Sequence, residues 1–97
     1  MIDLDAKHLA TVRGILQSAA PGLQAFAFGS RARGHAKRFS DLDLALSSKQ
    51  PIEWRTLALL REAFEESDLP ITVDLVDWNQ TTPAFRDHAG PLIPLDD

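Results

Sequence analysis

Residues 41–46 alternate strictly between two kinds of side chain. Leucines occupy positions 42, 44 and 46, and acidic or small residues occupy the positions between them. Because successive side chains of a β-strand point to opposite faces of a sheet, this pattern predicts a strand that buries its leucines. Asp41 and Asp43 then share the other face, and the leucine face must be covered by another layer of structure.

The other elements follow from periodicity and from turn residues. Apolar side chains recur at helical spacing over residues 5–19, which Pro21 and Gly22 terminate, and again over residues 51–67 after Pro51. The second helix has an apolar stripe formed by Trp54, Leu57, Leu60 and Phe64. We predict further elements as strands over residues 23–28 and 71–76, a short exposed helix within the polar residues 29–40, a last helix over residues 82–90 and an edge strand over residues 91–95.

This order predicts one domain over residues 1–97 with an α/β (α+β) fold. We expect a small mixed sheet with helices packed on one face. Trp54 and Trp78 are both expected to pack in the interior. The absence of cysteine excludes disulfides and thiolate metal sites.

The charged residues indicate where the protein is located and which partners it binds. The N-terminal segment is interrupted by charged residues, so we expect neither a signal peptide nor a membrane span, and a cytoplasmic location. The net charge of -4 argues against direct nucleic-acid binding and fits a small substrate or a basic protein partner better.

A third carboxylate turns the aspartate pair into a candidate metal-binding site. Asp41 and Asp43 alone are also consistent with a solvated strand edge. Asp74 lies on the polar face of the strand predicted over residues 71–76, so three carboxylates converge if the two strands are neighbours. Such a cluster favours a hard divalent cation, usually Mg²⁺ with phosphates as co-ligands. Asp77 competes with Asp74, but it has the opposite strand parity and is also consistent with a loop carboxylate.

A small polar turn precedes these carboxylates in the sequence. Gly29 and Ser30 directly follow the first predicted strand, where glycine allows an anion to approach the backbone and the following amides can donate to phosphate oxygens. Arg31 and Arg33 add positive charge beside them. A Gly-Ser pair is usually only a turn, so its meaning depends on its position relative to the aspartates.

The combination resembles a known signature. Gly29-Ser30, ten intervening residues and then Asp41-Leu42-Asp43 resemble the signature of the polymerase-β-like nucleotidyltransferase superfamily. The amino-acid sequence of residues 28–34 and 40–45 is similar to that of the minimal nucleotidyltransferase (MNT) branch. The segment Val73-Asp74-Leu75-Val76 resembles the strand that carries the family's third carboxylate.

The resemblance implies a polymerase-β-like fold and specific roles. Asp41, Asp43 and Asp74 would bind two Mg²⁺ ions, and Asp74 would also orient or deprotonate the attacking hydroxyl. The outgoing phosphates of ATP would contact Gly29, Ser30, Arg33 and Arg31.

The family also implies a partner. MNT proteins are commonly antitoxins of HEPN-domain ribonuclease toxins, and they act by adding AMP to a tyrosine of the toxin, by binding it, or both. We also expect the acceptor to arrive on a second protein, because this chain leaves little room for an acceptor-binding domain. Two alternatives stay open at this point, namely a small-molecule acceptor and a purely binding, non-catalytic antitoxin.

Overall fold

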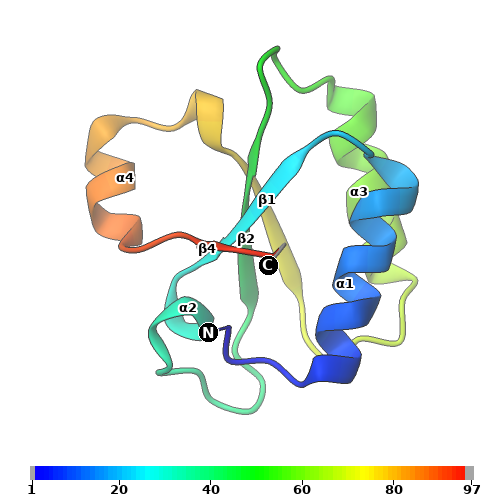
Figure 1. The fold of residues 1–97 in the computed structure, drawn as a ribbon, viewed down its shortest axis with the longest axis vertical. Coiled ribbons are helices and arrows are strands. Elements are labelled where there is room, and N and C mark those ends of the chain that lie inside the picture. Colours follow the sequence, from blue (N-terminus) through cyan, green and yellow to red (C-terminus); the bar gives the residue numbers. More distant parts are fainter. Residues whose placement is uncertain (1, 96–97) are drawn as a thin grey trace.

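We describe residues 2–95 from a computed structural model (Figure 1). The elements in chain order are α1 (Ala6–Ala19), β1 (Gln24–Phe28), α2 (Ser30–Arg33), β2 (Leu42–Ser47), α3 (Trp54–Glu65), β3 (Val73–Asp77), the 3-10 helix η1 (Trp78–Gln80), α4 (Pro83–Ala89) and β4 (Ile93–Pro94). The predicted order of helices and strands is confirmed, including the short strand near the C-terminal end. Over residues 2–95, no helix is both long enough and apolar enough to cross a membrane.

The four strands form one mixed sheet in the order β3-β2-β1-β4. β1 pairs antiparallel with β2 and with β4, whereas β2 pairs parallel with β3. A parallel pair requires a connection that crosses over a face of the sheet, and α3 supplies it. The sheet is therefore mixed, as the sequence predicted.

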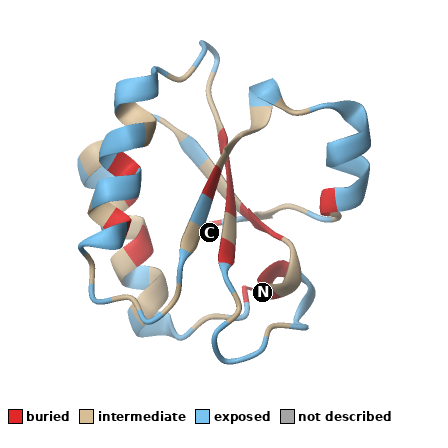
Figure 2. Ribbon diagram, turned by 180° about the vertical axis from the view of Figure 1, so that it is seen from behind, coloured by how far each residue is buried: buried red, intermediate tan, exposed pale blue. Residues whose placement is uncertain are grey.

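The main core lies between the sheet and the helices α1 and α3. The alternating leucines of β2, Leu42, Leu44 and Leu46, are completely buried there. The inner faces of the two helices contribute Val12, Leu16, Leu60 and Phe64. Figure 2 shows buried segments on the central strands and on the two helices that cover this face of the sheet. The strict alternation of residues 41–46 thus identified the buried face correctly.

A second, smaller cluster lies on the opposite face of the sheet. Phe28 and Ala45 from the strands and Ala89 from α4 form it. The rings of Phe28, Trp78 and Phe85 contact one another, with centroids 6.0–6.3 Å apart. The expectation that helices cover one face holds for α1 and α3, while α4 lies on the other side of the sheet (Figure 1). Trp78 packs as predicted.

The prediction for Trp54 is wrong. Helix α3 begins at this residue rather than at Pro51, and the Trp54 side chain is 73% exposed. Ile52, which precedes the helix, packs against the core at this end instead. The Arg55 guanidinium lies over the indole, 5.6 Å from the ring centroid. Periodicity alone placed Trp54 on the apolar stripe because it could not fix the first turn of the helix.

Candidate active site

The pairing of β2 with β3 places two aspartates side by side. Asp43 is directly opposite Asp74 in the parallel register, and both side chains lie on the face away from the buried Leu44 and Leu75. Asp43 is half-buried and Asp74 is exposed. Asp41 immediately precedes β2. The two strands are therefore neighbours, which was the condition for the three carboxylates to converge.

The pKa of Asp43 reflects the negative charge gathered in this cluster. Burial raises the pKa of its carboxyl group, and the negative charges of Asp74 and then Asp41 raise it further. A divalent cation would offset this repulsion, so the donor set fits Mg²⁺. Over residues 2–95, no group of three or more acidic or histidine side chains lies close enough together to hold a metal ion by itself. Mg²⁺ in proteins is usually bound by one or two carboxylates together with substrate phosphates.

The raised pKa predicts how stability depends on pH. Folded Asp43 keeps its proton at pH values where the unfolded chain has lost it, so the free energy of unfolding falls as pH rises from 3.8 through the raised pKa. In metal-free buffer, Asp43→Asn should therefore be more stable than the wild type near pH 7, and this advantage should disappear below the ordinary carboxyl pKa. Urea unfolding between about pH 3 and pH 7 measures it. If the difference in unfolding free energy between the two proteins does not change with pH, the pKa of Asp43 is not raised in the folded protein.

Gly29 brings the start of α2 against the same cluster. It follows Phe28, the residue paired with Asp43 across β1 and β2, and it has φ 75° and ψ -151°. A Cβ atom at this position would lie 2.5 Å from Oδ2 of Asp43. The Gly29 carbonyl accepts hydrogen bonds from the amides of Ala32 and Arg33, and the first amides of the helix, those of Ser30 and Arg31, have no acceptor within the helix. The turn that leads into α2 is therefore packed against the Asp43 carboxylate at Gly29.

Replacing Gly29 by alanine should therefore cost both stability and activity. The observed backbone angles lie in a region that is essentially restricted to glycine, and a side chain there costs about 1–3 kcal/mol before its overlap with Asp43 is counted. Gly22→Ala is the matched control, because Gly22 also has a positive φ, of 96°, but has open space around its Cβ position. Thermal unfolding and nucleotide binding should show that only Gly29→Ala impairs binding, although both variants are destabilised.

The sequence predicted the charge of Arg31 beside the turn at Gly29, but the side chain extends into the protein instead. Its side chain is only 6% exposed. The guanidinium donates to main-chain carbonyl oxygens at 2.7 Å and 3.0 Å, those of Asp3 and Ser40, and more weakly to those of Lys37 and Arg38. The short helix α2 is thus not fully exposed, and Arg31 stabilises the loop that leads to Asp41 rather than extending toward the turn at Gly29. A buried arginine that satisfies carbonyl groups carries no periodic signal in the sequence.

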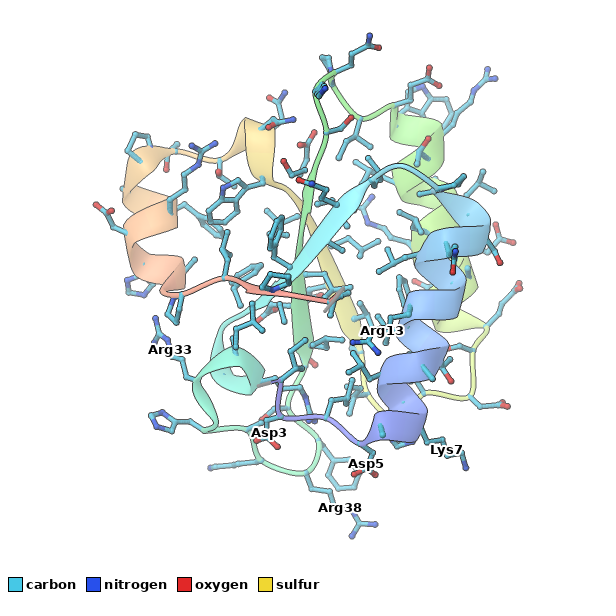
Figure 3. All side chains as sticks on the ribbon, in the orientation of Figure 1. Asp3, Asp5, Lys7, Arg13, Arg33 and Arg38 are labelled. Atoms are coloured by element: carbon cyan, nitrogen blue, oxygen red, sulfur yellow. The ribbon has the colours of Figure 1, made fainter. Side chains whose placement is uncertain are left out.

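Arg33 is exposed and connects α2 with α4. Its Nη2 donates to the carbonyl oxygen of His88 at 3.2 Å, and a Cβ on Gly90 would overlap its guanidinium. Figure 3 shows Arg33 extending from α2 toward the C-terminal end of α4. Here a cation also interacts favourably with the helix dipole. The contribution of α4 beside Gly29, where Phe85, His88 and Ala89 line a hollow of about 270 Å³, was not predicted from the sequence.

Asp77 has a local structural role. It is the last residue of β3, and its carboxylate accepts a hydrogen bond of 3.1 Å from the amide of Asn79 at the start of η1. It pairs in register with Leu46, on the leucine side of β2, and so does not share the face of Asp43 and Asp74. This geometry favours Asp74 as the third carboxylate.

Comparison with known proteins agrees with this geometry. The family model described as "Polymerase beta, Nucleotidyltransferase" matches residues 11–90. A Haemophilus influenzae protein named "Probable protein adenylyltransferase MntA" is 48% identical over 86 residues, which are 89% of this chain and 75% of the relative. A solved structure described as "Crystal structure of the toxin-antitoxin with AMP-PNP" is similar with a TM-score of 0.72 and 24% identity, over 90% of this chain and 71% of that chain.

The solved structure supports the fold, while the family match and the sequence relative support the enzyme class. The residues that resemble the family signature are those that the fold brings together, namely the turn at Gly29 and the aspartates of β2 and β3. The chain therefore belongs to the polymerase-β nucleotidyltransferase family, in its minimal nucleotidyltransferase branch, and it is a nucleotidyltransferase.

Proposed function

We propose that this chain transfers AMP from ATP to a hydroxyl group, most simply a tyrosine, of a HEPN-domain ribonuclease toxin, and that it acts in the cytoplasm as the antitoxin. The observation that carries the proposal is the pairing of Asp43 with Asp74 beside the glycine turn. Gly29 and Asp74 lie on either side of Asp43, which supports a triphosphate held at the glycine turn and an acceptor hydroxyl oriented by Asp74. The name of the sequence relative supports a protein acceptor, and the description of the solved structure supports a toxin partner.

Each residue has a chemical task in this reaction. Asp41, Asp43 and Asp74 would hold two Mg²⁺ ions, which neutralise charge on the triphosphate and on the reacting oxygens when bound. The amides after Gly29, with the Ser30 hydroxyl, would hold the outgoing phosphates. Asp74 would accept the proton of the acceptor hydroxyl as its oxygen forms a bond to the α-phosphorus. The bond from the α-phosphorus to the β-phosphate then breaks, and pyrophosphate leaves in line.

Composition makes the acceptor easy to identify. This chain contains no tyrosine, so any AMP found on a tyrosine must be attached to the partner. The net charge of -4 also suits a partner with a basic, RNA-binding surface, because opposite charges accelerate their encounter.

The proposal is tested by intact-mass measurement of the partner. Incubation of this chain with a HEPN ribonuclease, ATP and Mg²⁺ should increase the partner's mass by one or more AMP units, and fragmentation should locate them on tyrosine. The same mixture with Asp41→Asn should leave the mass unchanged. A partner that is inhibited without a mass change would favour a purely binding antitoxin. A partner that is neither bound nor inhibited would overturn the antitoxin role, and small-molecule hydroxyl acceptors would then be tested.

A further inference from the structure

β3 forms an open edge of the sheet directly beside the candidate active site. It is the outermost strand, and over residues 2–95 no strand pairs with its outer side. The amide of Leu42 donates to the carbonyl of Thr72, and the parallel register pairs Leu42 with Val73. Main-chain groups alternate in direction along a strand, so those of Asp74 and Val76 face β2. The amides and carbonyls of Val73 and Leu75 therefore face outward.

A groove runs along this open edge. Its volume is about 470 Å³, and its walls are formed by the second half of α3, by Leu69 and by residues 71–75. Apolar side chains from the leucine side of the sheet, Phe64, Leu69 and Leu75, line it together with the polar Arg61 and Glu65. Asp74 lines the groove as well. The groove therefore extends to the residue that is paired with Asp43.

We propose that this groove binds an extended segment of the acceptor protein, which pairs with β3 as an added strand and carries the reacting hydroxyl opposite Asp74. This inference rests on the proposed function, since it concerns the acceptor of that reaction. Unpaired main-chain groups at a sheet edge select an extended segment, because only such a segment can satisfy alternate amides and carbonyls.

Strand geometry then orients the reacting residue. Residues that are directly opposite each other in neighbouring strands point to the same face, with Cβ atoms about 4.5–5.5 Å apart. A hydroxyl residue opposite Asp74 would thus extend over the face that Asp43 shares, with Asp74 between the two. Its two chain neighbours would point to the other face, toward Phe64 and Leu75. The groove therefore selects a hydroxyl residue that is flanked by apolar residues.

The first test measures amide exchange by NMR on the full chain. In the free protein, the amides of Val73 and Leu75 should exchange with solvent much faster than those of Asp74 and Val76. Adding the ribonuclease partner identified by the mass measurement should slow exchange at Val73 and Leu75 by about tenfold or more, in line with one added hydrogen bond at each amide. A partner that binds and becomes modified while exchange at these two amides is unchanged would overturn the proposal.

The second test uses variants at the edge. Val73→Pro removes an outward amide but no hydrogen bond to β2, and proline is tolerated on the free side of an edge strand. It should raise the KM for the partner about tenfold while the affinity for ATP stays unchanged, and Val73→Thr, which keeps the amide, should behave like the wild type.

A second variant guards against misfolding of the proline variant. Arg61→Glu changes a side chain that lines the groove, whereas Arg55→Glu changes an exposed arginine on the same helix outside it. Only Arg61→Glu should raise the KM for the partner. Wild-type transfer with normal KM in folded Val73→Pro and Arg61→Glu would exclude the groove but leave the proposed function intact. If the wild type modifies no partner at all, the proposed function itself fails.

Discussion

Asp43→Asn is expected to reduce AMP transfer by about a thousandfold or more. The substitution preserves the size of the side chain but removes the charge at the centre of the cluster, where Asp43 lies between Gly29 and Asp74. Loss of about 4 kcal/mol or more of charge stabilisation in the transition state corresponds to a rate lower by about a thousandfold or more. Single-turnover transfer to the partner, followed by mass, measures the effect. Asp68→Asn, at an exposed carboxylate outside the cluster, is the control and should retain activity.

A binding measurement separates this effect from unfolding. Mg²⁺ with ATP, at about 100 times its dissociation constant, should stabilise the wild type by about 2.7 kcal/mol, or at least roughly 10 °C in Tm for a domain of this size. Asp43→Asn should show no such increase, although without ligand it should be the more stable protein at neutral pH. A wild-type Tm that does not respond to millimolar Mg²⁺ and ATP would argue strongly against a catalytic site at these carboxylates.

Asp74→Ala and Asp77→Ala should have opposite effects. Asp74 is exposed and faces Asp43, so its loss should leave the fold intact and reduce transfer by about a hundredfold to ten-thousandfold, the range for removal of a general base. Asp77 accepts the amide of Asn79 at the start of η1, so its loss should lower stability by about 0.5–2 kcal/mol and spare activity.

Denaturation and single-turnover kinetics on the same preparations would distinguish these outcomes. The pKa of Asp43, followed by NMR titration, should also fall in Asp74→Ala, because one of the charges that raises it is removed. An inactive Asp77→Ala beside an active Asp74→Ala would show that the strand parity is reversed. Such a result would also remove the basis for an acceptor groove beside Asp74.

The sequence by itself determined the strands and the faces of the sheet on which Asp43, Asp74 and Asp77 lie. Alternation of leucine with aspartate is a local property with a period of two, so it fixed the buried face of β2 and the parity of Asp41 and Asp43 without further information. The same parity argument separated Asp74 from Asp77, and the structure agrees with it. The spacing from Gly29 to Asp41 was sufficient to recognise the family, which the family match and the sequence relative confirm.

Only the tertiary structure decided which side chains meet across the chain. The register that pairs Asp43 with Asp74 depends on the crossover through α3, and the approach of Gly29 to Asp43 depends on the antiparallel pairing of β1 with β2. Arg31 carries the same charge as Arg33 in the sequence, but one is buried among carbonyl groups and the other is exposed beside α4. Likewise, β3 is an open edge because of the order of the strands in the sheet. These are contacts between segments far apart in the sequence, and no local period encodes them.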